Sequence, residues 1–224
     1  HLEGMTALIK ATKADGVVLD TKGSSSHEIQ QAADLAKPGV VMYSEGMAVP
    51  KDMPGIVSGR VHNALYYPPL LNLNKLIKPD FAIFRVAELA YDRIRREYAT
   101  SFFNGYGTEL NIFRPGRPEW MEEDYRFFGR TLRILRENHS NFISFGYTPL
   151  IPTLSDGVFV NKWPSEKKII YTIFSLKPEG FLGNLFEVEK PASDWHFVDL
   201  WNHEEVQVQE SGEKHLIPVD LEAF

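Results

Sequence analysis

The 224-residue chain contains no cysteine, which excludes disulfide bonds, thiolate nucleophiles and cysteine-based zinc sites. It also lacks long apolar runs: no stretch approaches the roughly 18 continuous apolar residues of a membrane-spanning helix. The first residues do not show the basic, apolar and small-residue order of a signal peptide. The sequence therefore predicts no membrane partner, and it leaves the cellular compartment open.

Several catalytic signatures are also missing. The seven histidines show neither HExxH nor HxH spacing, which disfavours a zinc hydrolase. No GxSxG elbow occurs, which disfavours a serine hydrolase. The segment 104–107 (Asn-Gly-Tyr-Gly) has glycines for a tight loop, but neither the GxGxxG nor the Walker pattern, so no phosphate-binding loop is predicted.

Basic patches are lacking as well. The net charge is -6, and Lys and Arg are spread among acidic residues, so we expect no nucleic-acid partner. An acidic surface suits a neutral substrate. A hydrophobic fraction of 43% is sufficient for an ordinary globular core.

Apolar runs of strand length alternate with helical patterns over the first two thirds of the chain. This alternation favours a parallel sheet with helices outside it. The predicted strands are 16–20, 39–45, 55–62, 81–85 and 100–104. The predicted helices are 2–13, 26–37, 86–98 and 119–138, with a loop and a short helix before residue 77.

After Tyr147 the pattern changes to short β-type runs separated by turn residues, with no run of helix length. This pattern predicts an antiparallel β-sandwich. The runs are 157–161, 168–176, 184–188, 195–201, 205–209 and 216–221. We therefore divide the chain into residues 1–147 and residues 148–224.

The first part is too short for a complete (β/α)8 barrel, which takes about 250 residues. Its alternation ends near Ser144, and the shortfall equals roughly three βα units of about 30 residues each. The sequence therefore predicts an α/β fold that holds the C-terminal part of a TIM barrel, about strands four to eight. The N-terminal part of the same barrel is expected to lie upstream. On this count, Asp20 ends the fourth strand and Glu45 the fifth.

These two carboxylates are the main candidates for catalysis. Each follows an apolar strand, and the carboxyl ends of parallel strands lie on the face where such folds place their active sites. Two adjacent carboxylates can serve as nucleophile and proton donor in the cleavage of a glycosidic bond, a reaction that needs no cofactor. Alternatively, Asp20 caps the next helix, and Glu45 forms a salt bridge with Lys51 or Arg60.

Further polar and aromatic residues near predicted strand ends are candidates for substrate binding. They are Lys22, His62, Asn63, Asp80, Arg85, Asn104 and Tyr106. Lys22 can keep Asp20 ionised, and Asp80 is a candidate third carboxylate. Solvated side chains, a structural histidine and helix capping remain the ordinary alternatives.

Two segments resemble the α-amylase-type and related retaining α-glycosidases. They are Gly-Val-Val-Leu-Asp-Thr-Lys at 16–22 and Tyr-Ser-Glu-Gly at 43–46. The segment from 101 through the helix ending at 138 also looks like the tail of large bacterial glycosidase-like proteins. In these families an aspartate nucleophile follows the fourth strand, a glutamate acid/base follows the fifth, and a β-sandwich follows the barrel. The resemblance thus implies that Asp20 is the nucleophile and Glu45 the acid/base.

The chain also departs from the family pattern. The family's arginine two residues before the nucleophile is Val18 here, and the Asn-His-Asp motif of the third acid is absent. The resemblance therefore implies a divergent glycoside hydrolase acting on α-linked oligosaccharides or glycoconjugates, in a secreted or periplasmic location. Two alternatives remain. One is a non-catalytic carbohydrate-binding protein on the same fold, and the other is an unrelated α/β protein.

Overall fold

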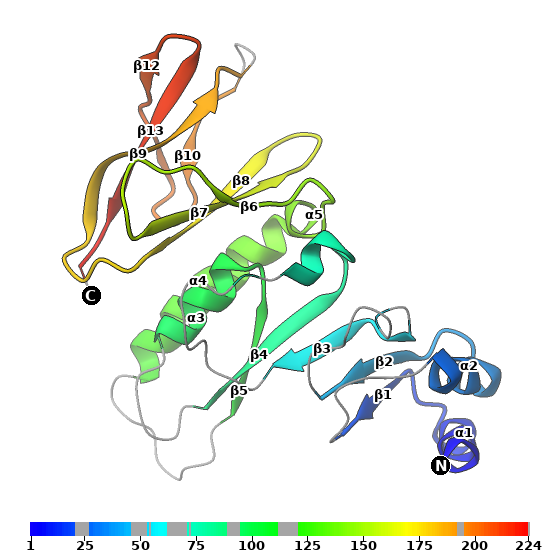
Figure 1. Ribbon diagram of the computed structural model, residues 1–224. Helices are drawn as coiled ribbons and strands as arrows, with labels where there is room; N and C mark the ends of the chain where they lie inside the picture. Colours follow the sequence, from blue (N-terminus) through cyan, green and yellow to red (C-terminus); the bar gives the residue numbers. More distant parts are fainter. Residues whose placement is uncertain are drawn as a thin grey trace.

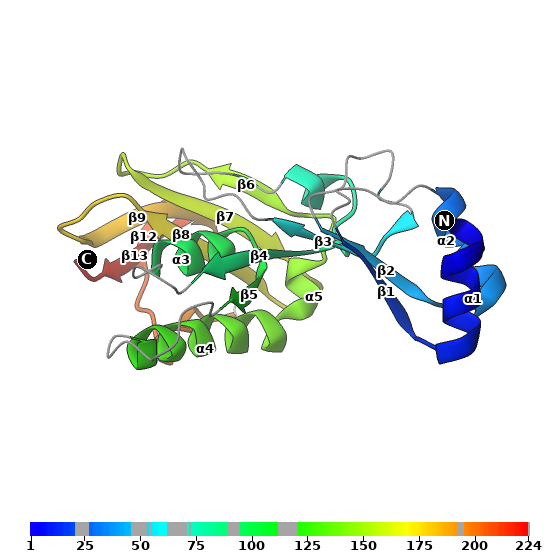
Figure 2. The same cartoon turned by 90° about the horizontal axis from the view of Figure 1, so that it is seen from below.

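The computed structural model describes residues 1–20, 27–45, 53, 55–61, 71, 73–88, 95–111, 121–191 and 195–223. For residues 60, 61, 73, 83–88 and 111 it describes the backbone alone. The described part of the chain forms an α/β unit followed by small antiparallel sheets (Figure 1). Figure 2 shows helices α1 and α2 at one end of the molecule and the C-terminal strands at the other.

The α/β unit contains one five-stranded sheet in which every neighbouring pair is parallel. Its strands are β1 (Gly16–Leu19), β2 (Val41–Ser44), β3 (Ser58–Val61), β4 (Ala82–Glu88) and β5 (Gly107–Asn111). The strands lie in the order in which they occur along the chain. An order without reversal is typical of a (β/α)8 barrel, whereas a doubly wound sheet reverses its order at a switch point.

The described residues also form several helices. They are α1 (Leu2–Thr12), α2 (His27–Ala36), the 3-10 helix η2 (Leu73–Leu76), α3 (Arg95–Phe103), α4 (Met121–Glu137) and α5 (His139–Phe142). α1 ends at Lys13, which adopts the left-handed conformation and donates its backbone N–H to the carbonyl of Ile9 at 2.8 Å. Among the described residues, no helix has the length and apolar character needed to cross a bilayer.

The two faces of β1 and β2 differ in burial. Val17 and Leu19 pack against a core that contains Met42 of β2 together with Ile9 of α1 and Ala33 of α2. On the opposite face, Val18 is 55% exposed and Val41 is 50% exposed. Since side chains alternate between the faces of a strand, the helices cover one face of this end of the sheet and leave the other open.

The structure corrects two predicted elements. Residues 86–98 are not one helix, because β4 includes residues 86–88. Residues 100–103 belong to α3 and are not a strand. Thr100, Phe102 and Phe103 favour strands, but tertiary packing overrides this preference: the Phe103 ring lies 5.6 Å from that of Phe174.

The remaining strands are antiparallel, as the sequence predicts. One sheet contains β6 (Thr148–Ile151), β7 (Val158–Pro164) and β8 (Ile169–Ser175). A second contains β9 (Phe181–Glu189), β12 (Gln209–Ser211) and β13 (Lys214–Leu221), and β10 (Val198–Asp199) pairs with β11 (Glu204–Glu205). The first two sheets share a core through β7, β9 and β13. It consists of Val158, Val160, Leu185, Phe186 and Ile217.

A buried polar junction joins the two parts of the chain. The carbonyl oxygen of Phe103, the last residue of α3, accepts hydrogen bonds from Asn161 Nδ2 at 3.0 Å and from Thr172 Oγ1 at 2.8 Å. Trp163 Nε1 in turn donates to Thr172 Oγ1 at 2.9 Å. Strands β7 and β8 therefore fix the end of α3, the helix that leads into β5.

Candidate functional site

Asp20 and Glu45 directly follow two neighbouring parallel strands. Val18 pairs with Tyr43 and Leu19 with Ser44, and the Glu45 backbone N–H donates to the Leu19 carbonyl at 3.2 Å. Because residues two apart share a face, Asp20 continues the face of Val18, and Glu45 continues the face of Tyr43. The two acids thus lie at the same end of the sheet, and continued alternation along the strands predicts that both belong to the face opposite the helices.

The two carboxylates differ in their surroundings. Asp20 is exposed, whereas Glu45 is half-buried and follows the fully buried Ser44. Both take part in interactions within the protein. Unequal solvation of two neighbouring carboxyl groups is the property that assigns different roles to the acids of a two-carboxylate site.

Four of the predicted substrate-binding residues lie wholly or partly outside the described part of the chain. Lys22, His62 and Asn63 fall outside the described residues. Arg85 lies in β4, in register with Val61 of β3, and only its backbone is described.

The other three lie at the opposite end of the sheet. Asp80 precedes β4 and is exposed. Asn104 is fully buried and donates to the Thr100 carbonyl at 3.0 Å, and Tyr106 is 5% exposed in the core below β5. Asn104 and Tyr106 come before a strand and not after one, because the segment predicted as a strand is the end of α3. The structure therefore does not bring these three residues to Asp20 and Glu45.

One acidic residue that the sequence analysis does not single out lies at the same end of the sheet as Asp20 and Glu45. Glu88 is the last residue of β4 and pairs with Asn111, the last residue of β5. An apolar run that ends in an acid was the signal used for Asp20 and Glu45. Because the predicted strand ends at residue 85 and a helix is predicted from residue 86, Glu88 is not identified as an acid at a strand end.

A charged cluster joins the starts of α3 and α4, which follow β4 and β5 and so begin at this same end. The Arg95 guanidinium lies 2.6 Å from Glu123 Oε1 and 3.5 Å from Oδ1 of the fully buried Asp124. The hydrogen bond to Glu123 is the largest cause of the raised pKa of Arg95. Burial, followed by the charge of Asp124, raises the pKa of Tyr98. The cluster holds the two helices together.

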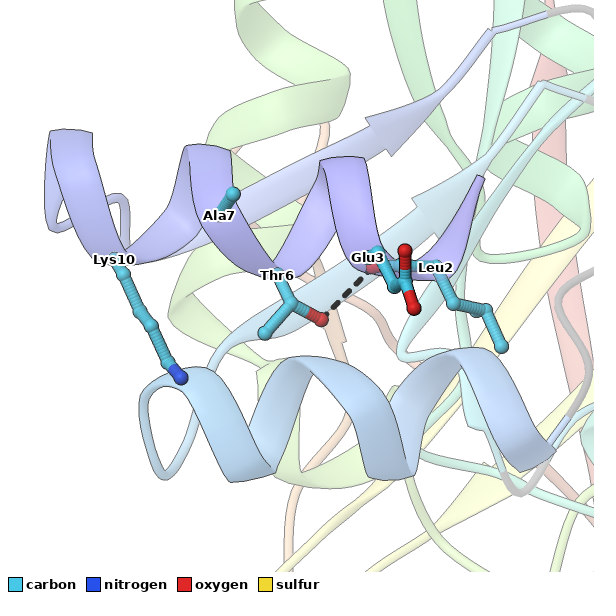
Figure 3. Close-up of a pocket in the computed structure, with 5 residues that line it drawn as sticks. All are labelled: Leu2, Glu3, Thr6, Ala7 and Lys10. Atoms are coloured by element: carbon cyan, nitrogen blue, oxygen red, sulfur yellow. Dashed lines mark hydrogen bonds between the residues drawn. The ribbon is translucent and has the colours of Figure 1, made fainter.

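The described residues show neither a metal-binding cluster nor a groove that includes the two acids. Among them, no three His, Asp or Glu side chains are grouped so that they could hold a metal ion. A shallow groove runs along the outer helix α1, lined by Leu2, Glu3, Thr6, Ala7 and Lys10 (Figure 3). Its lining residues all come from one helix and include none of the candidate acids.

No family model and no curated protein matches the sequence. The structure is similar to solved α-amylase-family glycoside hydrolases. A cyclomaltodextrinase matches 98% of this chain and 46% of its own, with a TM-score of 0.58 and 13% identity. An Anoxybacillus alpha-amylase matches 100% and 62%, with a TM-score of 0.62 and 13% identity. AmyP in complex with maltose matches 100% and 65%, with a TM-score of 0.60 and 11% identity.

The chain thus spans 46 to 65% of the length of these proteins. At such low identity the likeness shows the fold. It confirms, at the level of fold, the resemblance that the segments around Asp20 and Glu45 indicated.

Proposed function

We propose that the chain carries the catalytic carboxylates of a retaining glycoside hydrolase that acts on α-linked oligosaccharides. In this proposal, residues 1–147 form the part of a (β/α)8 barrel that contains its later strands, and residues 148–224 form a β-sandwich that follows it. The observation that supports the proposal is that Asp20 and Glu45 directly follow two neighbouring parallel strands, at the same end of the sheet. The complex of AmyP with maltose supports an oligosaccharide as the class of substrate.

In the proposed mechanism, Asp20 attacks the anomeric carbon and Glu45 protonates the departing oxygen. A covalent glycosyl-enzyme forms, and Glu45 then removes a proton from the water that releases the sugar. The exposed Asp20 suits the role of nucleophile, and the half-buried Glu45 suits that of the proton donor.

Glu88 is the candidate third carboxylate in place of Asp80. Its position at the end of β4 puts it at the same end of the sheet as Asp20 and Glu45. A negative charge there would stabilise the positive charge that develops on the sugar ring in the transition state.

Hydrolysis of aryl α-glucosides with good and poor leaving groups tests the proposal. Asp20→Asn should abolish hydrolysis of both, whereas Glu45→Gln should slow the substrates with poor leaving groups more strongly, because these depend on proton donation. Equal hydrolysis by the wild type and both variants would overturn the proposal. Maltotriose binding that is lost in Asp20→Asn, without turnover by the wild type, would instead identify a non-catalytic carbohydrate-binding protein.

A further inference from the structure

We infer that the exposed side of α4 binds the sulfate or phosphate groups of an anionic polysaccharide. The inference rests on a stripe of four exposed arginines around one exposed glycine. They are Arg126, Arg130, Arg133 and Arg136, with Gly129 among them. Figure 2 shows α4 along one edge of the molecule. No step of the proposed hydrolysis uses this arginine stripe.

The helix brings together arginines that are separated in the sequence. Arg126, Arg130 and Arg133 are spaced by four and three residues, so at about 100° per residue they lie within about 60° of one another around α4. Arg136 follows about 60° further round, and the four positions span about 15 Å along the helix axis. The stripe is therefore a line of positive charge, although Lys and Arg form no long run in the sequence.

Most of these positive charges have no carboxylate partner in the described part of the chain. Arg126 lies 3.9 Å from Oε1 of Glu122, and its side chain is 78% exposed. Arg130, Arg133 and Arg136 form no ion pair with any described residue. Because the chain as a whole carries a net charge of -6, the stripe is a local positive field on an acidic protein and attracts external anions.

Two of the arginines are held in place by the turn between β10 and β11. The Arg133 guanidinium donates a hydrogen bond to Nε2 of His203 at 2.5 Å. The Arg130 guanidinium lies 5.4 Å from the centre of the Trp201 ring, which also packs on Phe127 of α4. An indole ring and an imidazole nitrogen orient the two side chains without adding a negative charge. Side chains that are already ordered lose less conformational entropy when an anion binds.

Gly129 leaves the helix backbone accessible at the centre of the stripe. It lies on an exposed helix face, where glycine is less favourable than alanine. A Cβ at this position would meet no atom within 4 Å, so packing against the described residues does not require glycine here. A ligand that passes between Arg126 and Arg133 can therefore approach the helix closely.

The surroundings of the stripe indicate which kind of anion fits it. Glu122 and Glu137 lie at its two ends, on the same side of α4. A membrane surface or a nucleic-acid duplex extends well beyond about 15 Å and would meet both acids, whereas a single flexible chain can avoid them. Arginine binds sulfate-like and phosphate oxyanions through paired hydrogen bonds. The choice of a polysaccharide as the flexible chain rests on the proposed function.

Titration calorimetry with a short heparin oligosaccharide, at low and at high salt, tests the inference. The double variant Arg126→Gln/Arg136→Gln removes two charges and leaves the contacts to the β10–β11 turn intact. Lys167→Gln/Lys168→Gln, at exposed positions between β7 and β8, removes the same charge elsewhere and is the matched control. Gly129→Gln keeps every charge and fills the open position on the helix.

We expect the wild type to bind the oligosaccharide, and the affinity to fall with salt because exposed charges are screened. The arginine double variant should bind about tenfold more weakly, and the lysine double variant should bind like the wild type. Gly129→Gln should also bind more weakly, although it should unfold at a higher urea concentration because glycine disfavours a helix.

Equal affinities of the wild type and the arginine double variant would overturn the inference, as would an equal loss in the lysine control or unchanged binding by Gly129→Gln. Tighter binding of a DNA oligonucleotide, a polyglutamate peptide or anionic vesicles would assign the stripe to another partner and would also overturn it. Asp20→Asn should keep the affinity for heparin. A failure of this inference is therefore distinct from a failure of the proposed hydrolysis.

Discussion

The backbone amide of Glu45 donates a hydrogen bond to the carbonyl oxygen of Leu19 at 3.2 Å, across the carboxyl ends of β1 and β2. This bond continues the hydrogen-bond ladder between the two parallel strands up to Leu19, the residue before Asp20. Together with the four paired positions of β1 and β2, it sets the register in which Asp20 and Glu45 follow their strands. A slip of one residue in either strand would move its acid to the opposite face of the sheet.

The two faces of β2 should respond differently to truncation. Met42→Ala removes a fully buried side chain and should lower the free energy of unfolding by about 2–5 kcal/mol. Val41→Ala, on the open face, should cost about 1 kcal/mol or less. Urea unfolding measures both, and a larger loss for Val41→Ala would contradict the assignment of the acid-bearing face.

The junction at Phe103 should contribute strongly to stability. The Asn161 side chain donates a hydrogen bond to the Phe103 carbonyl, and its Oδ1 accepts one from the Leu150 backbone N–H at 3.0 Å. Asn161→Ala removes both bonds and should lower the free energy of unfolding by about 2–3 kcal/mol. Asn184→Ala, which removes an exposed hydrogen bond to Gln209, should cost about 0.5 kcal/mol or less. Similar values for the two variants would show that the buried junction does not hold the parts together.

Lys75 should make stability depend on pH in the alkaline range. It is 5% exposed, and burial, partly offset by the charge of Asp80, lowers its pKa from 10.5 to about 8. Between pH 8 and 10.5 the unfolded chain binds more protons than the folded one, so stability should rise with pH there. The rise should reach about 3 kcal/mol at most.

Urea unfolding at several pH values tests this dependence. Lys75→Met should remove the rise, whereas Lys167→Met, at an exposed position, should retain it. An equal rise in the Lys75→Met variant would assign the effect to other groups.

Glu88 and Asp80 should differ in their effect on hydrolysis. Glu88→Gln should lower kcat/KM by about 10²-fold or more, because it removes a charge expected to stabilise the transition state. Asp80→Asn should leave kcat/KM nearly unchanged, since Asp80 lies at the opposite end of β4. The reverse order of effects would restore Asp80 as the third carboxylate.

The sequence predicts those parts of the fold that depend on local periodicity. Strands β1, β2, β7, β8, β9 and β13 and helices α1, α2 and α4 lie close to their predicted positions. The predicted runs 195–201 and 205–209 contain only the two-residue strands β10 and β11, and β6 has no predicted counterpart. Asp20 and Glu45 are predicted as site residues because each acid directly follows a short apolar run.

The region between Val86 and Tyr106 was misassigned because its structure depends on distant contacts. Phe103 packs against Phe174 of β8, with 5.6 Å between the ring centroids. This contact stabilises a helix at residues 100–103, where local preference favours a strand. As a result, Asn104 and Tyr106 are predicted at the carboxyl end of a strand, whereas they precede β5, and Glu88 is not predicted as an acid at the end of β4.

The most direct test of the central claim is to locate a trapped glycosyl-enzyme. The chain would be treated with a fluorinated α-glucosyl fluoride, digested and analysed by mass spectrometry. The account predicts one added glycosyl mass on the peptide that contains Asp20, with increased accumulation in Glu45→Gln, because loss of the base slows release of the sugar. An adduct on a different carboxylate, or hydrolysis with inversion of the anomeric configuration, would contradict it.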